Sequence, residues 1–232
     1  MKILVTRPLA DGQEIAARLA EQGHQAVLAP LLEPRYFDGP EPDLENVRAI
    51  LATSANGIRA LARRTARRDR PVFAVGPQTA EEARNAGFTD VKSADGDAVA
   101  LAGATARWAE PGATLLHVCG EEAPGTLADT LTAKGFAVQR AVLYGMATAQ
   151  ALPPEARNAL SQGAIDAVMF FSPKTAGLFL ELARDLPVTG LTALCISPNT
   201  ARVLPPGSFA GIRIAEKPNQ EAMLKLTGQP QG

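Results

Sequence analysis

The chain has 232 residues, of which 46% are apolar and 20% are charged, and its formal net charge is −1. This length allows one large or two small domains with a real core, and the near-neutral charge gives no support for sequence-independent nucleic-acid binding. No apolar run approaches the roughly 20 residues of a membrane-spanning helix, the N-terminus lacks a secretory pattern, and two cysteines argue against a disulfide framework, so we expect a cytoplasmic protein.

Short apolar runs alternate with segments of helical spacing along the whole chain. The runs predict strands at 2–5, 25–28, 49–53, 72–75, near 91, 114–118, 136–143, 167–171, 192–196 and 211–215. The intervening segments predict helices at 15–22, from 54 onward, and at 77–85, 97–109, 124–134, 154–161, 174–184, 198–204 and 219–226. Such alternation predicts parallel sheets covered by helices on both faces.

Three short patterns recur in the same order in the two halves of the chain. Residues 3–5 resemble 115–117, Ser54 corresponds to Ser172, and 76–80 resemble 197–201. The shared order favours an internal duplication. The alternative is that strand–helix units in general resemble one another.

Two segments with clustered proline and glycine are predicted linkers, at 33–42 and 144–152. The first strand–helix–strand unit, which ends near residue 28, is too small to fold by itself. It must therefore pack against the part of the chain that follows the second linker. We predict a discontinuous domain of residues 1–32 plus 153–232 and an inserted domain of residues 43–143.

The strand-to-helix junctions share a design that suits anion binding. A small or hydroxyl residue, often followed by proline, begins the helix, whose free N–H groups and dipole then face outward. Any well-capped helix would look the same at a single junction, but recurrence favours an anion-binding cleft shared by two domains. The junctions are Thr6-Arg7-Pro8, Thr53-Ser54-Ala55, Gly76-Pro77-Gln78-Thr79, Ser172-Pro173-Lys174-Thr175 and Ser197-Pro198-Asn199-Thr200.

Other chemistry-bearing patterns are weak. The sequence has no dinucleotide, P-loop or nucleophile-elbow motif. His24 and His117 have no companions at metal-ligand spacing and are expected to be structural, so no metal site is predicted. Cys119 and Cys195 are expected to be buried apolar residues, with a reactive thiol as the alternative. The arginines between 59 and 70 are expected to form a solvated face, with a nucleic-acid patch as the alternative.

Tyr144 is one of only two tyrosines and ends the predicted strand that leads into the second linker. At this position its hydroxyl could face the cleft as a hydrogen-bond donor. The alternative is a tyrosine that packs on the domain surface at a hinge.

Together these motifs resemble the uroporphyrinogen-III synthase family over nearly the whole chain. Ser197 departs from the pattern, since the family has glycine there. The resemblance implies two three-layer α/β/α domains with parallel five-stranded, flavodoxin-like sheets, joined by a two-stranded hinge. The segments that carry it are Thr6-Arg7-Pro8, 53–57, 74–80, Leu143-Tyr144, 170–176 and 195–201.

The resemblance also implies an activity. Members are cofactor-free lyases of haem biosynthesis that close hydroxymethylbilane, a linear tetrapyrrole with eight carboxylates, into uroporphyrinogen III. Water is lost and ring D is inverted through a proposed spiro intermediate. It further implies a monomer and allows a transient contact with hydroxymethylbilane synthase. The alternative is a non-catalytic two-domain clamshell protein that binds a small anionic ligand through the same helix starts.

The resemblance assigns roles to particular residues. Tyr144 matches the family tyrosine whose suggested role is to assist departure of the substrate hydroxyl, so it is the predicted catalytic residue. The predicted substrate-binding residues are Arg7, Thr53, Ser54, Ala55, Gly76, Thr79, Ser172, Pro173, Lys174, Ser197 and Thr200.

Overall fold

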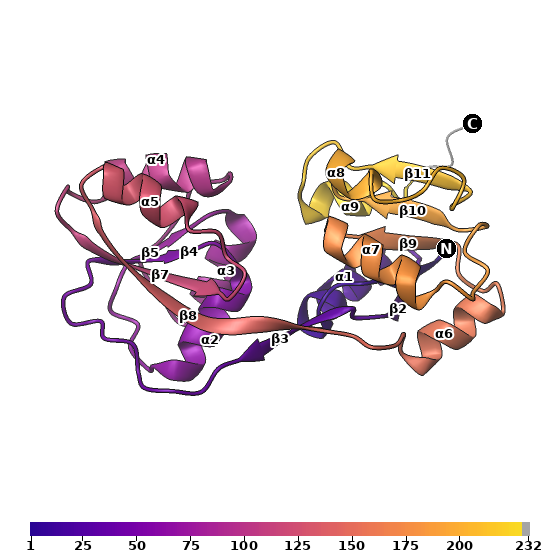
Figure 1. The fold of residues 1–232 in the computed structure, drawn as a ribbon, viewed down its shortest axis with the longest axis horizontal. Helices are drawn as coiled ribbons and strands as arrows, with labels where there is room; N and C mark the ends of the chain where they lie inside the picture. Colours follow the sequence, from indigo (N-terminus) through magenta and orange to yellow (C-terminus); the bar gives the residue numbers. More distant parts are fainter. Residues whose placement is uncertain (229–232) are drawn as a thin grey trace. The chain divides into compact units, whose positions relative to one another are not determined.

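The computed structural model describes residues 1–228, and the chain divides into two compact units. Unit 1 consists of residues 1–33 and the chain from Ala147 onward, and unit 2 consists of Pro34–Met146. In each unit a sheet lies between helices (Figure 1). Among residues 1–228, no helix is long and apolar enough to cross a membrane. The predicted α/β fold with mainly parallel sheets is confirmed.

Unit 1 contains a five-stranded sheet of order β11-β10-β9-β1-β2, in which the neighbouring strands are parallel. Its strands are β1 (Lys2–Val5), β2 (Gln25–Leu28), β9 (Ala167–Phe170), β10 (Thr192–Cys195) and β11 (Gly211–Ile214). Its helices are α1 (Leu9–Glu21), α6 (Pro154–Ser161), α7 (Pro173–Leu182), α8 (Pro198–Ala201) and α9 (Gln220–Lys225).

Alternate residues of β1 face opposite helix layers, as expected of a strand buried on both sides. Leu4 packs in one core cluster with Phe179 of α7 and with apolar residues of α6. Ile3 and Val5 pack in a second cluster with Ile15 of α1 and with residues of α9. The sheet is therefore the middle layer of unit 1.

Unit 2 contains a six-stranded sheet of order β3-β8-β7-β4-β5-β6. One core cluster joins this sheet to α2 and α3, and another joins its opposite face to α4 and α5. The strands are β3 (Leu32–Tyr36), β4 (Ala49–Ala52), β5 (Val72–Ala74), β6 (Val91–Ser93), β7 (Thr114–Gly120) and β8 (Ala137–Thr148). The helices are α2 (Ala55–Arg64), α3 (Pro77–Asn85), α4 (Ala98–Trp108) and α5 (Thr126–Ala133).

The sheet of unit 2 has a sixth strand, β3, that the prediction of five strands lacked. β3 overlaps the start of the segment predicted as the linker 33–42, and β8 continues to Thr148, inside the predicted linker 144–152. Pro34 prevented the prediction of β3, because proline lacks a backbone N–H and therefore usually indicates the end of a strand. At the edge of a sheet, where β3 lies, one side of the strand needs no partner and proline is tolerated.

The two sheets share one plan. Numbered from β2, the order in unit 1 is β2-β1-β9-β10-β11, and numbered from β8, the order in unit 2 is β8-β7-β4-β5-β6. The recurring sequence patterns lie in or directly after equivalent strands, namely β1 and β7, β9 and β4, and β10 and β5. Gly23 and Gly135, with φ values of 77° and 85°, end the equivalent helices α1 and α5. This correspondence supports an internal duplication.

Candidate functional site

The carboxyl ends of β4 and β7 lie side by side in the middle of the unit 2 sheet. From β4 the chain proceeds through α2 to β5 on one side, and from β7 it proceeds through α5 to β8 on the other side. Open parallel sheets bind ligands where the connections diverge in this way, outside the carboxyl ends of the strands. The residues that follow β4 and β7 are therefore the first place to look for a site.

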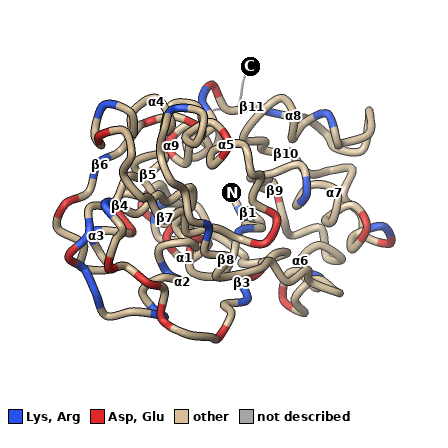
Figure 2. Tube along the Cα trace, turned by 60° about the vertical axis from the view of Figure 1, so that its left-hand side comes forward, with Lys and Arg blue, Asp and Glu red and all other residues tan. Residues whose placement is uncertain are grey.

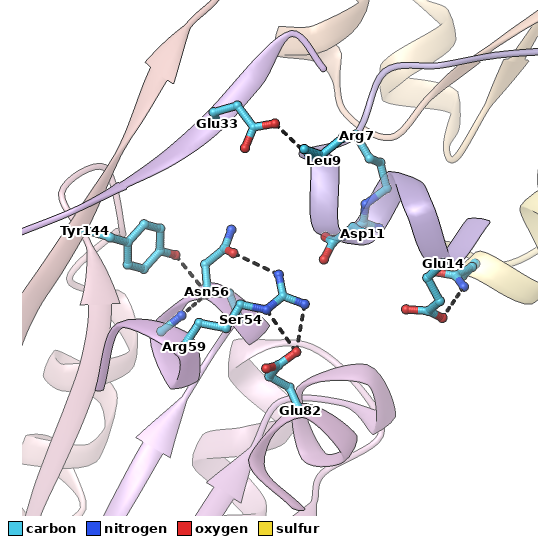
Figure 3. A network of polar contacts seen from close by, with 12 residues as sticks. Arg7, Leu9, Asp11, Glu14, Glu33, Ser54, Asn56, Arg59, Glu82 and Tyr144 are labelled. Atoms are coloured by element: carbon cyan, nitrogen blue, oxygen red, sulfur yellow. Dashed lines mark hydrogen bonds and ion pairs between the residues drawn. The ribbon is translucent and has the colours of Figure 1, made fainter. Parts of the chain in front are cut away.

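Ser54 begins α2 as its N-cap, in an extended conformation with φ −157° and ψ 154°. Its Oγ accepts a hydrogen bond from the Gly57 N–H at 3.1 Å. The same Oγ lies 2.8 Å from the phenolic oxygen of Tyr144 on β8 (Figure 3). Two predicted site residues that are far apart in sequence thus form one hydrogen-bonded pair.

The Tyr144 hydroxyl is held in its protonated form. Partial burial raises the pKa of Tyr144 above its usual value of 10.0, although the hydrogen bond with Ser54 acts in the opposite direction. At neutral pH the group is therefore a neutral hydroxyl that can donate a hydrogen bond.

Gly120 makes room for the ring of Tyr144. The two residues are cross-strand partners in β7 and β8, where the register shifts between Cys119 and Gly120. A Cβ atom on Gly120 would lie 2.8 Å from Cζ and 3.1 Å from the hydroxyl oxygen of Tyr144. Irregularities of this kind often redirect a side chain next to a functional site.

A pocket of about 170 Å³ opens beside Tyr144. Because small-molecule sites usually enclose roughly 300–1,000 Å³, it has room for one substituent of a larger ligand. The lining residues are Gly120, Glu121, Glu122, Ala123, Tyr144, Gly145 and Met146.

Arg59 ties α2 to α3 at the same edge of the sheet. Its Nε and Nη2 donate to one carboxylate oxygen of Glu82 at 2.9 and 2.7 Å, and its Nη1 donates to Asn56 Oδ1 at 3.2 Å (Figure 3). Arg59 and Glu82 have only 21% and 22% of their side chains exposed. The network therefore fixes the start of α2, on which Ser54 sits.

The other arginines between 59 and 70 are also engaged within unit 2. The Arg63 guanidinium lies 4.4 Å from the centroid of the Tyr36 ring, Arg64 donates to the Phe37 carbonyl, and Arg68 donates to the Ala86 carbonyl. Arg63 is exposed and the others are partly exposed, so the expected solvated face is present, but carbonyls and aromatic rings of unit 2 also contact these side chains. Elsewhere, basic and acidic residues are interspersed along the chain (Figure 2).

Gly76 and Thr79 lie at the start of α3, which follows β5, the strand next to β4. Gly76 is an N-cap without a side-chain hydrogen bond, and a Cβ atom at this position would have open space around it. Thr79 is buried in the first turn. The backbone at this helix start is accessible to a ligand.

In unit 1, β1, β9 and β10 are neighbours and end at one edge of the sheet. Ser172 caps α7 by accepting the Thr175 N–H at 3.1 Å, and Ser197 caps α8 by accepting the Thr200 N–H at 3.3 Å. Ser197, where the family pattern has glycine, is therefore a working cap. Of the other predicted residues here, Pro173 is the first residue of α7 and Lys174 is exposed beside it.

The start of α1 differs from the expected open anion site. The Glu33 carboxylate accepts the Leu9 N–H at 2.7 Å, and Arg7 forms an ion pair with Asp11 (Figure 3). The Arg7 guanidinium also lies 5.0 Å from the centroid of the Phe171 ring. Carboxylates of the chain itself already occupy part of this junction, which the sequence pattern did not reveal.

The two cysteines and His117, which the sequence also offered as candidates, are buried. Cys119 and Cys195 are free and buried, and burial raises the pKa of Cys195 to about 11, which argues against a reactive thiol. His117 is buried on β7, as expected of a structural residue, but one of its ring nitrogens has a polar partner in Thr53. Within residues 1–228 no three acidic, histidine or cysteine side chains cluster as metal ligands.

We expect Ser54→Ala to lower the free energy of unfolding by about 1 kcal/mol, because α2 loses its cap. The pKa of Tyr144 should rise further, because its hydrogen bond with Ser54 lowers that pKa. Absorbance titration in a Tyr36→Phe background, where Tyr144 is the only tyrosine, measures the second effect. Ser161→Ala, at the exposed end of α6, is the control. An unchanged Tyr144 titration would contradict the observed pairing.

Comparisons with known proteins now bear on this site. Residues 13–225 match the family model described as uroporphyrinogen-III synthase HemD. The structure resembles that of a uroporphyrinogen-III synthetase from Helicobacter pylori, with a TM-score of 0.66, 19% identity and coverage of 97% of both chains. It also resembles a mutant uroporphyrinogen III synthase from Thermus thermophilus, with a TM-score of 0.53, 18% identity and coverage of 98% of this chain and 97% of that one. A comparison with curated protein sequences gives no match. Because the family model spans most of its length, the chain belongs to the uroporphyrinogen-III synthase family.

Proposed function

We propose that this chain closes hydroxymethylbilane to uroporphyrinogen III through the Ser54–Tyr144 pair, with inversion of ring D and loss of water. Family membership makes it a cyclising lyase of haem biosynthesis that acts on a small molecule. The observation that carries the residue assignment is the 2.8 Å contact between Ser54 Oγ and the Tyr144 hydroxyl at the carboxyl edge of β4.

Tyr144 would assist the first step, in which the terminal hydroxyl of the substrate leaves. The nitrogen of the terminal pyrrole that carries the hydroxymethyl group, at the opposite end of the chain from ring D, supplies the electrons that break the carbon–oxygen bond and form an azafulvene. Because Tyr144 stays protonated, its O–H can donate a hydrogen bond to the departing oxygen. The Ser54 O–H can then donate a hydrogen bond to the phenolic oxygen of Tyr144 and hold the ring in place. The pocket beside Tyr144 has room for one group near this oxygen.

The second task would be orientation. The substituted carbon of ring D must attack in place of the free carbon, and holding the chain in that geometry lowers the barrier without an acid–base pair. Helix starts suit this role, because their N–H groups bind carboxylates without a large positive net charge. The proposed binding residues are Thr53, Ser54, Ala55, Gly76 and Thr79 in unit 2, and Arg7, Ser172, Pro173, Lys174, Ser197 and Thr200 in unit 1.

We also propose that the two units are flavodoxin-like domains joined by a two-stranded hinge of β3 and β8. Two features support this. The sheet of unit 1 has the strand order 2-1-3-4-5 when its own strands are numbered along the chain, as in flavodoxin. The boundaries between the units also fall inside β3 and β8. That the chain is a monomer and that it contacts hydroxymethylbilane synthase transiently both stay predictions.

Incubation with freshly prepared hydroxymethylbilane tests the proposed function. We expect the type III isomer to form faster than the type I isomer that arises spontaneously, as measured by chromatographic separation after oxidation to porphyrins. A sample without protein gives the spontaneous rate. Type I product alone would overturn the proposal and support the non-catalytic anion-binding alternative.

We expect Thr79→Ala and Thr200→Ala to lower the rate of type III formation by less than about fivefold each, because the backbone donors of α3 and α8 remain. Initial rates measure the effect. Thr132→Ala, near the end of α5 where the side chain donates to the Ala128 carbonyl, is the matched control. Complete loss of activity in either variant with the fold retained would contradict the assignment of binding mainly to the backbone.

A further inference from the structure

His117 is a buried histidine next to the strand end that carries Thr53. Only 1% of the residue is exposed, and its Nε2 lies 3.3 Å from Thr53 Oγ1. Within residues 1–228 its Nδ1 has no hydrogen-bond partner. Because buried polar side-chain atoms nearly always have a partner, this arrangement needs an explanation.

The ring of His117 is neutral at physiological pH. Burial lowers the pKa of His117 from 6.5 to about 4, and the positive charge of Arg140 acts in the same direction. Arg140 is the cross-strand partner of His117 on β8. A neutral imidazole carries one N–H, so one ring nitrogen donates and the other accepts.

The surroundings favour a proton on Nε2. In that form the N–H donates to Thr53 Oγ1, and the unpaired atom is a lone pair on Nδ1 in the positive field of Arg140. In the other form an N–H without an acceptor would be buried in the same field. Buried donors without an acceptor are the rarer case in proteins, and a positive charge repels an N–H and attracts a lone pair.

A proton on Nε2 determines what the Thr53 hydroxyl can do. An oxygen that accepts from His117 has its own hydrogen free to donate, and His117 is its only side-chain partner in the described chain. Thr53 is half-exposed and directly precedes Ser54. We propose that His117 is a positioning residue that holds the Thr53 hydroxyl as a donor toward a carboxylate of the substrate, which rests on the proposed function.

Nitrogen-15 NMR of the unmodified protein tests the hydrogen bond without any activity measurement. The chain has only two histidines, and the variant His24→Gln assigns the signals. At pH 7 we expect His117 to be neutral, with the proton on Nε2. A proton on Nδ1, or a ring that titrates near its usual pKa, would overturn the inference.

Kinetics test the consequence for substrate binding. Thr53→Val and His117→Leu should each raise KM for hydroxymethylbilane about tenfold and lower kcat less, because a hydrogen bond to a charged group is lost or misdirected. The double variant should behave like either single variant. His117→Gln, whose amide N–H can take the place of Nε2–H, should restore most of the affinity.

Two results would contradict this role. The first is that the increases in KM caused by His117→Leu and Thr53→Val multiply in the double variant, as independent effects would. The second is that His117→Gln raises KM as much as His117→Leu does. An unmodified protein that makes no type III isomer would overturn the proposed function and with it the carboxylate role. A ring protonated on Nδ1 in an active protein would overturn only the inference about His117.

Discussion

Replacing Tyr144 by phenylalanine is expected to lower the rate of type III formation on the order of 100-fold and to leave the protein folded. The substitution removes the hydroxyl that would assist departure of the leaving group. It keeps the ring, which packs against Gly120 and the core residues around α2. The loss should therefore appear in kcat rather than in stability.

The measurement is the initial rate of type III formation from fresh hydroxymethylbilane, corrected for spontaneous type I product, together with thermal unfolding. Tyr36→Phe is the matched control, since Tyr36 is the other tyrosine and its ring contacts Arg63. Unchanged turnover in Tyr144→Phe would remove Tyr144 from the mechanism. A similar loss in Tyr36→Phe would indicate a general effect of substitution.

Replacing Gly120 by alanine is expected to lower the same rate on the order of tenfold or more, although Gly120 carries no reactive group. The added Cβ would lie 2.8 Å from Cζ of Tyr144, closer than real Cβ atoms approach other atoms. The ring or the strand that carries it must therefore shift, and we expect the shift to lengthen the 2.8 Å contact between the Tyr144 hydroxyl and Ser54 Oγ. We expect the free energy of unfolding to fall by about 1–3 kcal/mol, as is typical when a packed site is overfilled.

A double variant distinguishes displacement of Tyr144 from general damage. If Gly120→Ala acts through Tyr144, adding it to Tyr144→Phe should lower the rate little further. Gly211→Ala is the control, because this glycine also lies in a strand and a Cβ there meets no atom within 4 Å. Full activity in Gly120→Ala would show that the observed ring position is not needed for the reaction.

Much of the fold could be predicted from local pattern. Buried parallel strands form continuous apolar runs, so β1, β4 and β9 stand out from the helices around them. The serines at 54, 172 and 197 could be predicted as caps because an N-cap depends only on the residues of the next turn. The edge strand β3 could not, because Pro34 indicates a break unless the position of the strand in the sheet is known.

The candidate site was only partly predictable for a related reason. Ser54 and Tyr144 were each singled out by local pattern, but no pattern indicated that they form a pair or that Gly120 makes room for the ring. The hydrogen bond from the Leu9 N–H at the start of α1 to the Glu33 carboxylate could not be predicted either, because Glu33 lies on β3, which is far from α1 in the sequence.

By itself, the sequence determined the α/β alternation, the duplicated order of units, the helix caps and the family to which the chain belongs. The alternation, the order of units and the caps rest on periodicity and on contacts within one turn, whereas the family rests on the resemblance of the motifs at the strand-to-helix junctions. Only the tertiary structure decided that Tyr144 meets Ser54, that His117 meets Thr53 and that arginines 59–70 are engaged within unit 2. Such contacts join residues on neighbouring strands and helices, so they depend on strand order and register, which local spacing does not encode.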